Sequence, residues 1–155
     1  ADFLGNPKGF LCGHGARKKK GGEIRMLKMV IGGAWQGKRA YAEAHYQVTG
    51  ADWTDGSVCS REEFLKARAV CGLHAYIRRR MEDGAAPEAV ADEILAVCGE
   101  SLQVVTSDEV GYGVVPMDAG ERAWRETCGR ICTRLAARAD QVARVCCGIG
   151  TVIKG

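Results

Sequence analysis

The stretch VIGGAWQGKR at residues 30–39 decides how this chain is expected to fold. It connects an apolar run at 27–31, which is typical of a short buried strand, to a helix-forming segment at 38–46. A strand, a glycine-rich loop and a helix in this order form the context of the phosphate-binding pattern G-x-x-x-x-G-K-[ST]. The sequence therefore raises the question of whether this stretch binds phosphate.

The residues of the loop answer this question in part. Gly32, Gly37 and Lys38 meet the spacing of the pattern, but Arg39 stands where the pattern requires a serine or threonine hydroxyl for Mg²⁺. An arginine cannot bind Mg²⁺, although it could lie against a phosphate or point to solvent. The stretch is either a phosphate loop with a changed last residue or a glycine-rich turn that only resembles one.

The composition is that of an ordinary globular protein. The chain has 155 residues, of which 46% are apolar and 26% charged, enough for one domain with its own core. A net charge of +3 gives no argument for nucleic-acid binding. No apolar run approaches the roughly 18–20 residues that cross a bilayer, and no leader pattern is visible. We expect a cytoplasmic protein with no nucleic-acid partner and no membrane insertion.

Eight cysteines raise the alternatives of a zinc site or a disulfide. No C-x-x-C pair occurs, and Cys128 and Cys132 have no second pair at metal-site spacing. We therefore expect buried thiols that act as small hydrophobic side chains. The first segment, residues 1–25, is glycine-rich and contains a basic run at 17–20. We expect it to be a tail, or to lie upstream of a natural start at Met26, with the nucleotide-binding domain spanning 26–155.

The remaining chain alternates between strand and helix patterns. We expect a loop at 49–56, one long helix from the capping box at Ser60 to about Met81, and a helix from Pro87 to about Cys98. These are followed by a strand at 102–106, a helix from Asp118, a buried strand at 141–147 and an edge strand at 151–153. This alternation predicts an α/β domain with a mostly parallel sheet in three layers. Its ligand is expected at the carboxyl edge of the strands, which both glycine-containing loops leave.

Two stretches together resemble a known family. GGAWQGK at 32–38 resembles the phosphate loop of the bifunctional adenosylcobinamide kinase/adenosylcobinamide-phosphate guanylyltransferases of cobalamin biosynthesis. SDEVGYGVVP at 107–116 resembles the N-E-V-G-x-G-I-V-P signature of that family. The match continues in order through Gly129-Arg130, RLAARAD at 134–140 and CGIG at 147–150.

The resemblance implies a P-loop NTPase-like (RecA-like) fold, GTP or ATP with Mg²⁺, a cytoplasmic location and a homo-oligomer. It also implies phosphorylation of adenosylcobinamide at its aminopropanol hydroxyl, followed by GMP transfer. The chain departs from the family at Ile31, Gln36 and Arg39, and the span between the two matching regions is short. The strand that follows the first helix in the family is not visible in that span, and neither His45 nor His74 lies in a stretch that matches its guanylyl-accepting histidine.

The candidate site residues follow from the pattern and the resemblance together. We expect Lys38 to contact phosphate and, if His74 faces the nucleotide, its imidazole to attack the α-phosphate. A histidine on the apolar face of a helix is otherwise a core residue. The nucleotide-binding set is the loop and its first helical residues, Gly32, Gly33, Ala34, Trp35, Gln36, Gly37, Lys38 and Arg39.

Further candidates lie in the other loops. Glu109, Gly111 and Gly113 belong to the loop expected to face the site, and both glycines favour close approach of a ligand or a neighbouring loop. Glu109 is the expected metal ligand, with Asp108 and Asp55 as alternatives and Asp55 first of all a turn residue. Two other functions stay open: a catalytically inactive nucleotide- or corrinoid-binding sensor or partner protein of the same fold, and a kinase for another small alcohol.

Overall fold

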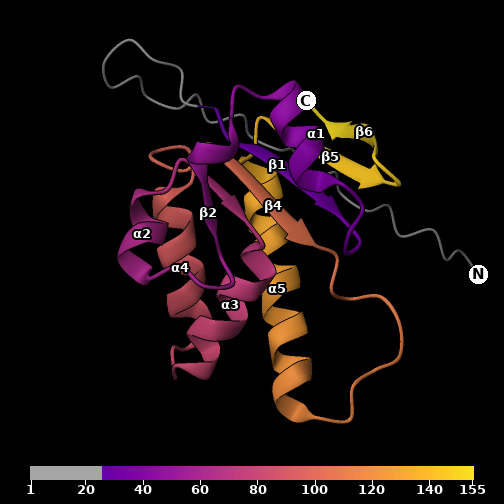
Figure 1. The fold of residues 1–155 in the computed structure, drawn as a ribbon. Helices are drawn as coiled ribbons and strands as arrows, with labels where there is room; N and C mark the ends of the chain where they lie inside the picture. The colour runs from indigo at the N-terminus through magenta and orange to yellow at the C-terminus, as the bar shows by residue number, and fades with distance from the viewer. Residues whose placement is uncertain (1–25) are drawn as a thin grey trace, which may run out of the picture.

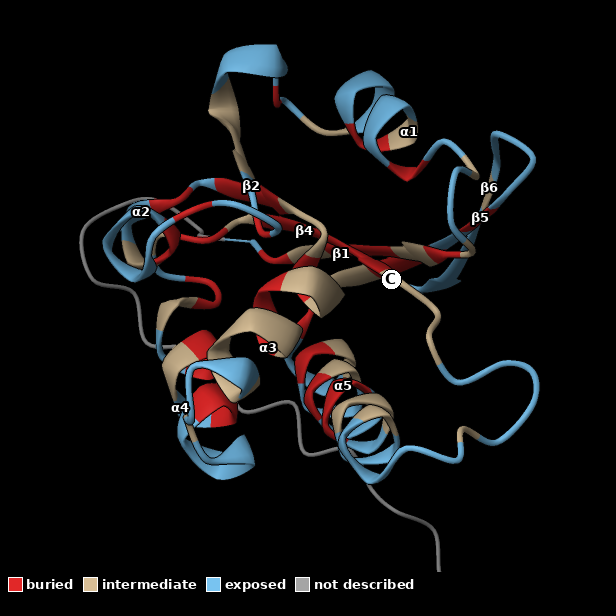
Figure 2. Cartoon of the chain, turned by 60° about the horizontal axis from the view of Figure 1, so that its bottom comes forward, coloured by how far each residue is buried: buried red, intermediate tan, exposed pale blue. Residues whose placement is uncertain are grey.

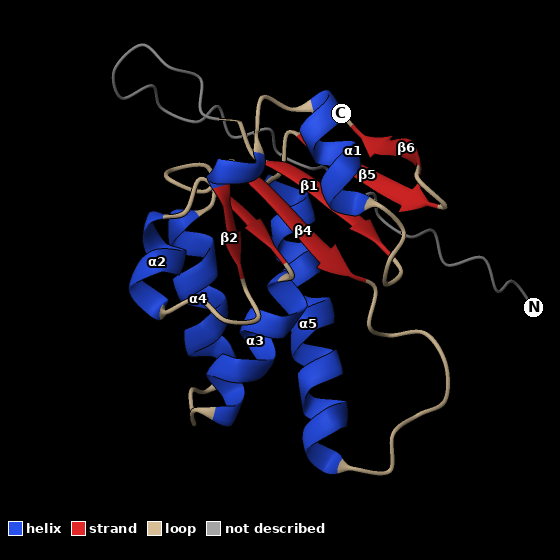
Figure 3. Cartoon of the chain, viewed as in Figure 1, coloured by secondary structure: helices blue, strands red, loops and turns tan. Residues whose placement is uncertain are grey.

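The structure, a computed structural model, describes residues 26–155, so the tail expected at 1–25 lies outside the described residues. One six-stranded sheet in the order β2-β3-β4-β1-β5-β6 forms its centre (Figures 1 and 3). The strands are β1 (Lys28–Gly32), β2 (Trp53–Asp55), β3 (Ala69–Cys71), β4 (Val104–Asp108), β5 (Gln141–Cys146) and β6 (Ile149–Lys154). All neighbouring strands are parallel except β5 and β6. The expected α/β class with a mostly parallel sheet is confirmed.

Helices cover both faces of this sheet. They are α1 (Lys38–His45), α2 (Arg61–Lys66), α3 (Leu73–Glu82), α4 (Pro87–Val97) and α5 (Ala119–Arg138), with a short 3₁₀ turn at Gly50–Asp52. Figure 2 shows α1 on one face of the sheet and α3, α4 and α5 on the other. The expected three-layer arrangement is therefore present.

Strand alternation explains why two apolar cores form. In β1, Met29 is buried in the larger core, which α2 to α5 complete, and Val30 is buried in the smaller one, beside Ala42 of α1. β4 repeats this pattern, because Val105 joins the larger core and Val104 the smaller. Successive side chains of a strand point to opposite faces, so a fully buried strand requires apolar residues at consecutive positions.

The expected long helix from Ser60 to about Met81 is wrong. The capping box at Ser60 is present, but α2 ends at Lys66 and the chain continues as β3. Gly72 then has a left-handed backbone, φ +71°, which interrupts the helical path before α3 begins. The sequence suggested one helix because the buried residues of α2, β3 and α3 recur at intervals close to those of a single amphipathic helix.

The loop expected at 49–56 also contains a strand. β2 runs parallel to β3 at the edge of the sheet, and its three residues are too few to show a period. β4 begins and ends two residues later than the expected strand, so Ser107 and Asp108 belong to the strand and not to the loop. The other expected elements are found to within two residues, including the helix from Asp118, whose carboxylate accepts from Glu121 N–H.

Candidate active site

The glycine loop, residues 32–37, leaves β1 at the carboxyl edge of the sheet. Gly32 faces Asp108 in register across the β1–β4 ladder, and its carbonyl accepts from Glu109 N–H at 3.0 Å. From these two neighbouring strands the chain passes to opposite faces, because α1 follows β1 and α5 follows β4 (Figure 2). Such a divergence between adjacent strands is where open α/β sheets bind ligands.

Close backbone contact determines which residues the loop accepts. A Cβ atom on Gly32 would lie 2.3 Å from the carbonyl oxygen of Val145 in β5, so no side chain is tolerated without movement of backbone. At the other end of the loop, Gly37 has φ +88° and immediately precedes α1. The backbone of the loop therefore explains why both positions of the phosphate-loop pattern are glycine, without reference to a ligand.

Gln36 joins the glycine loop to the β5–β6 turn. Its side-chain oxygen accepts from Cys147 N–H at 2.6 Å, and its backbone carbonyl accepts from Gly148 N–H at 2.9 Å. Gln36 was expected among the nucleotide contacts, and its role in holding the loop was not visible in the sequence, since the two partners are 111 positions apart.

Lys38 is the buried cation of the site. Only 8% of the residue is exposed, and its Nζ lies 2.6 Å from the carbonyl oxygen of Gly33 and 2.6 Å from Oδ1 of Asp108. An ammonium group has three N–H donors, so two are used by these contacts and one is left for a further acceptor. The lysine is thereby fixed where the loop and the end of β4 meet.

His74 lies in the first turn of α3 and not, as expected, on the apolar stripe of one long helix, because β3 and Gly72 intervene. Its Nδ1 accepts from Asp108 N–H at 3.1 Å, and its Nε2 is 3.5 Å from Asp108 Oδ2. The backbone carbonyl of His74 accepts from the Trp124 indole at 2.9 Å. The histidine therefore contacts Asp108 through both ring nitrogens.

The charge state of His74 follows from its surroundings. Burial lowers its pKa below the usual 6.5, and the nearby Lys38 and Arg78 act in the same direction, whereas Asp108 opposes them. The ring is therefore neutral at pH 7. Because Nδ1 accepts a hydrogen bond, the single ring proton is on Nε2, which faces the carboxylate.

Arg39 points away from the loop. Its Nε donates to Glu43 Oε1 at 3.0 Å, and its guanidinium lies 5.5 Å from the centre of the Trp53 ring. The Trp53 indole donates to the same Glu43 oxygen at 2.8 Å, which ties the three side chains together. The residue in the hydroxyl position of the motif is thus engaged with α1 and β2.

The other expected metal ligands have partners of their own. Both carboxylate oxygens of Glu109 accept from Arg144 Nε, at 3.1 and 3.2 Å. Asp55 Oδ1 accepts from the side chain and the backbone of Ser57, and these hydrogen bonds hold the pKa of the carboxyl below its usual value. Neither residue joins the contacts between Lys38 and Asp108. Within residues 26–155, no group of three or more potential metal ligands comes together.

The remaining loop residues are open to solvent. Trp35 is fully exposed and has φ +60°. The 109–118 loop extends away from the sheet before α5 begins (Figure 1), and nothing within 4 Å would meet a side chain at Gly111 or Gly113. Among residues 26–155, no neighbouring loop approaches these two glycines closely, and their contact with a ligand stays a prediction.

The expectation of buried thiols holds for only some cysteines. Cys59, Cys98 and Cys128 are buried, but Cys146 and Cys147, expected in a buried strand, are exposed at the β5–β6 turn. Burial raises the pKa of Cys128 to about 12, so this thiol is inert at neutral pH. Cys12 lies outside the described residues.

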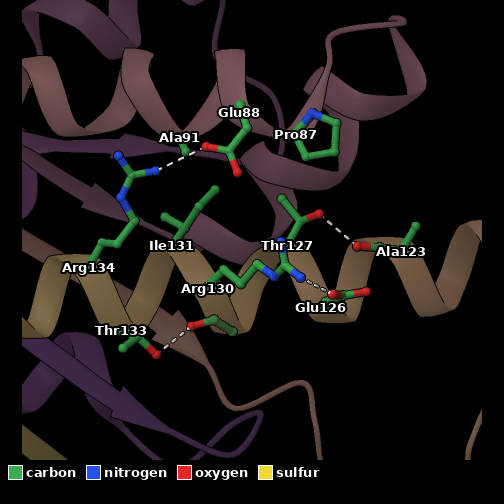
Figure 4. A pocket seen from close by; sticks show the side chains of 11 residues that line it. Pro87, Glu88, Ala91, Ala123, Glu126, Thr127, Arg130, Ile131, Thr133 and Arg134 are labelled. Atoms are coloured by element: carbon green, nitrogen blue, oxygen red, sulfur yellow. Dashed lines mark hydrogen bonds and ion pairs between the residues drawn. The ribbon is translucent and has the colours of Figure 1, made fainter.

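A pocket of about 650 Å³ lies elsewhere, between α4 and α5 (Figure 4). Its charged side chains pair with one another, as in Arg134 with Glu88 at 3.3 Å and Arg130 with Glu126 at 2.5 Å. None of its lining residues belongs to the glycine loop or to the end of β4. Because the chemistry-bearing residues gather at the sheet edge, we place the candidate active site there.

Comparison with known proteins bears on this site. The family model described as cobinamide kinase / cobinamide phosphate guanyltransferase matches residues 71–153, more than half of the chain. The chain belongs to this family. The matched region contains His74, Asp108 and the 109–118 loop, whereas the glycine loop and Lys38 precede it.

A curated relative agrees with the family assignment. The bifunctional adenosylcobalamin biosynthesis protein CobU of Salmonella typhimurium (strain LT2) is 44% identical over 71 residues, or 43% of this chain. The match covers 39% of that protein, so the chain aligns with about two fifths of its relative's length. In residues 26–155, no helix is both long and apolar enough to cross a membrane.

Proposed function

We propose that this member of the cobinamide kinase / cobinamide phosphate guanyltransferase family binds GTP or ATP at residues 32–39 and phosphorylates adenosylcobinamide, and that it then transfers GMP to the phosphorylated product. The observation that carries the proposal is the buried Lys38, held between the Gly33 carbonyl and the Asp108 carboxylate. A buried cation beside a glycine loop supplies the charge neutralisation that phosphoryl transfer needs.

The glycine loop would hold the triphosphate. Backbone N–H groups of residues 32–37 and the start of α1 suit an anion, and the third N–H of Lys38 is available for a phosphate oxygen. Exposed Trp35 would contact the base or the corrin ring. Arg39 would reach phosphate only after leaving Glu43.

Asp108 is the side chain best suited to hold Mg²⁺. It lies in register with the start of the glycine loop, and Mg²⁺ in such sites is held by one or two carboxylates together with substrate phosphates. Glu109, which the sequence favoured, and Asp55 are bonded to Arg144 and Ser57 and lie apart from the Lys38 contacts. The Asp108 carboxylate would have to share its oxygens between the metal ion and Lys38. A Mg²⁺ ion held by Asp108 would supply neutralisation of the phosphate charge during transfer.

In this proposal His74 positions Asp108. It accepts the Asp108 backbone N–H and directs its own N–H toward the carboxylate. The nucleophilic role considered for His74 would require a free ring nitrogen lone pair, and the only one present is already used. A covalent label from α-labelled GTP that is found on the wild type and lost in His74→Asn would restore the nucleophilic role.

The test uses the full chain with adenosylcobinamide, Mg²⁺ and either GTP or ATP, followed by the mass of the corrinoid. We expect a phosphate gain and then a GMP gain, both lost in Lys38→Ala and both kept in Lys66→Ala, which removes an exposed lysine of α2. A phosphate gain without GMP would limit the activity to the kinase step. Absence of any product from a protein that binds nucleotide would refute the enzymatic proposal.

One observation favours the alternative, a catalytically inactive nucleotide- or corrinoid-binding sensor. Arg39 occupies the hydroxyl position and is held by Glu43 and stacked over Trp53, so the usual metal ligand of the motif is missing. A sensor of this kind should bind nucleotide equally well with and without a chelator. An enzyme that depends on Mg²⁺ should lose affinity when the metal is removed. A kinase for another small alcohol, a homo-oligomeric state and a cytoplasmic location remain predictions.

A further inference from the structure

The β5–β6 turn contains two adjacent exposed cysteines in an unusual backbone. β5 ends at Cys146, β6 begins at Ile149, and the two residues between them, Cys147 and Gly148, have φ +51° and +78°. Positive φ at both central positions defines a type I′ hairpin turn, in which Asn-Gly, Asp-Gly and Gly-Gly predominate. A cysteine in the first position is disfavoured by the backbone, so the fold alone gives no reason for it.

The two adjacent thiols interact with each other. The Cys146 side chain is hydrogen-bonded to the Cys147 thiol, and this contact raises the pKa of Cys147. Arg144 lies two residues before Cys146 on the same face of β5 and is paired there with Glu109. Both thiols are exposed and so accessible to an oxidant in solution, where the thiolate is the reactive form of cysteine.

The same turn is bonded to the glycine loop. Cys147 N–H donates to the Gln36 side chain at 2.6 Å and Gly148 N–H to the Gln36 carbonyl at 2.9 Å. A Cβ atom on Gly37 would lie 3.4 Å from the Gly148 Cα, so the loop and the turn are also in close contact. A change in the peptide between the two cysteines therefore acts on the residue that precedes Gly37 and Lys38.

We propose that Cys146 and Cys147 form a redox-active vicinal dithiol, which a low-molecular-weight disulfide oxidises, and that this oxidation loosens the glycine loop through Gln36. The Cys146 thiolate attacks one sulfur of the small disulfide and releases one thiolate. The Cys147 thiol then loses its proton to solvent and displaces the second small thiolate from the Cys146 sulfur. The protein pair is oxidised by two electrons and the small disulfide is reduced to two thiols.

Backbone geometry links this chemistry to the loop. Adjacent Cα atoms across a trans peptide are about 3.8 Å apart, whereas disulfide-bonded cysteines have Cα atoms about 4.4–6.8 Å apart. Closing the ring must therefore distort the Cys146–Cys147 peptide, whose N–H donates to Gln36. A strained, exposed disulfide of this kind is also readily reduced again, so the modification is reversible.

The test treats the reduced full chain with oxidised glutathione and digests it with trypsin. Cleavage after Arg144 and Lys154 gives one peptide, VCCGIGTVIK, that contains both cysteines. We expect this peptide to become lighter by two hydrogen atoms and to resist alkylation. A stable glutathione adduct, or a peptide that alkylates fully at both cysteines, would overturn the proposal.

Hydrogen exchange of residues 32–38 then tests the coupling without nucleotide. We expect faster exchange in the oxidised wild type and no change after treatment of Cys147→Asn, because asparagine is favoured at this turn position and cannot form the bridge. Cys146→Ser serves as a second variant that keeps Cys147. Equal exchange in oxidised and reduced wild type would refute the coupling, whatever the peptide mass shows.

The effect on nucleotide affinity rests on the proposed function. We expect oxidation to raise the Kd for GTP or ATP about three- to tenfold, the change expected for one lost hydrogen bond, and reduction to restore it. If the reduced protein binds no nucleotide, the proposed function fails, while the peptide mass and hydrogen exchange still decide the dithiol proposal. Unchanged affinity in a fully oxidised protein that binds nucleotide would overturn the link to binding.

Discussion

At the scale of single residues, the candidate site depends on how Lys38, Asp108 and His74 divide the available contacts. The lysine uses one N–H on the loop and one on the carboxylate, and the histidine contacts both the backbone and the side chain of Asp108. Asp108 therefore connects the other two residues. The sequence suggested Lys38 by its motif and His74 only as an alternative, and it favoured Glu109 over Asp108 because Glu109 lies in the matching signature.

Asp108 and Glu109 make a direct comparison of the two candidate metal ligands. Removal of the Asp108 charge in Asp108→Asn is expected to lower the Mg²⁺-dependent transfer rate about 10²-fold or more, the loss typical of a preorganised electrostatic contact. Glu109→Gln removes an ion pair with Arg144, and we expect it to lower the transfer rate much less. The rate of corrinoid phosphorylation measures both, with the exposed Glu62→Gln on α2 as control. A larger loss in Glu109→Gln would assign the metal to Glu109.

His74 predicts a particular dependence of stability on pH. Its pKa is lower in the folded chain than the unperturbed 6.5, so the unfolded chain binds more protons. The contribution of His74 to the free energy of unfolding should therefore be complete above pH 6.5. It should be lost as the pH drops from 6.5 toward the pKa of the folded chain. The slope from one proton is at most about 1.4 kcal/mol per pH unit.

Urea denaturation of the wild type and His74→Asn between pH 7.5 and pH 5 measures this contribution. Asparagine preserves an acceptor near Asp108 N–H but does not titrate. We expect a shallower loss of stability in the variant. Identical pH profiles would mean that another group carries the acid sensitivity.

At the scale of secondary-structure elements, the sequence predicted best where the pattern is long or is fixed by a cap. The N-terminal caps at Ser60 and Asp118 and the proline at the start of α4 locate the first residues of three helices correctly. β2 and β3 were missed because each has three residues, too few for a period, and because their identity depends on strands distant in sequence. The misplaced His74 is a direct consequence of the missed β3.

Gly32 tests how the glycine loop is held against the sheet. In Gly32→Ala, the new Cβ would lie 2.3 Å from a backbone oxygen of β5, which cannot move without the strand. We expect a loss of about 1–3 kcal/mol in the free energy of unfolding, as for other overpacked sites. Gly33→Ala is the matched control, since its nearest neighbour is the flexible Gln36 side chain at 3.4 Å.

Urea denaturation of both glycine variants measures the difference. A clearly larger loss in Gly32→Ala than in Gly33→Ala supports tight contact between the loop and β5. Equal losses would contradict that contact and would point to a general intolerance of side chains in the loop.

At the scale of the whole molecule, the sheet order brings together residues that are far apart in the sequence. β1 lies between β4 and β5, so the loop after β1 meets the end of β4 on one side and the β5–β6 turn on the other. The sequence predicted that the two loops share an edge, because both follow parallel strands. The sequence did not indicate that the β5–β6 turn contacts the glycine loop, because contacts such as that of Gln36 with Cys147 depend on strand order.

The proposed nucleotide site is tested by a titration of GTP and ATP, with and without Mg²⁺, into wild type, Lys38→Ala and Lys66→Ala. Lys38→Ala loses one charge-assisted contact of about 1.5–3 kcal/mol, so its affinity for nucleotide should be roughly 10- to 100-fold lower than that of the wild type. Lys66→Ala, which removes the same charge far along the chain on α2, should bind like the wild type. If Lys38→Ala binds nucleotide as tightly as Lys66→Ala, residues 32–38 are a structural turn and the proposed active site is wrong.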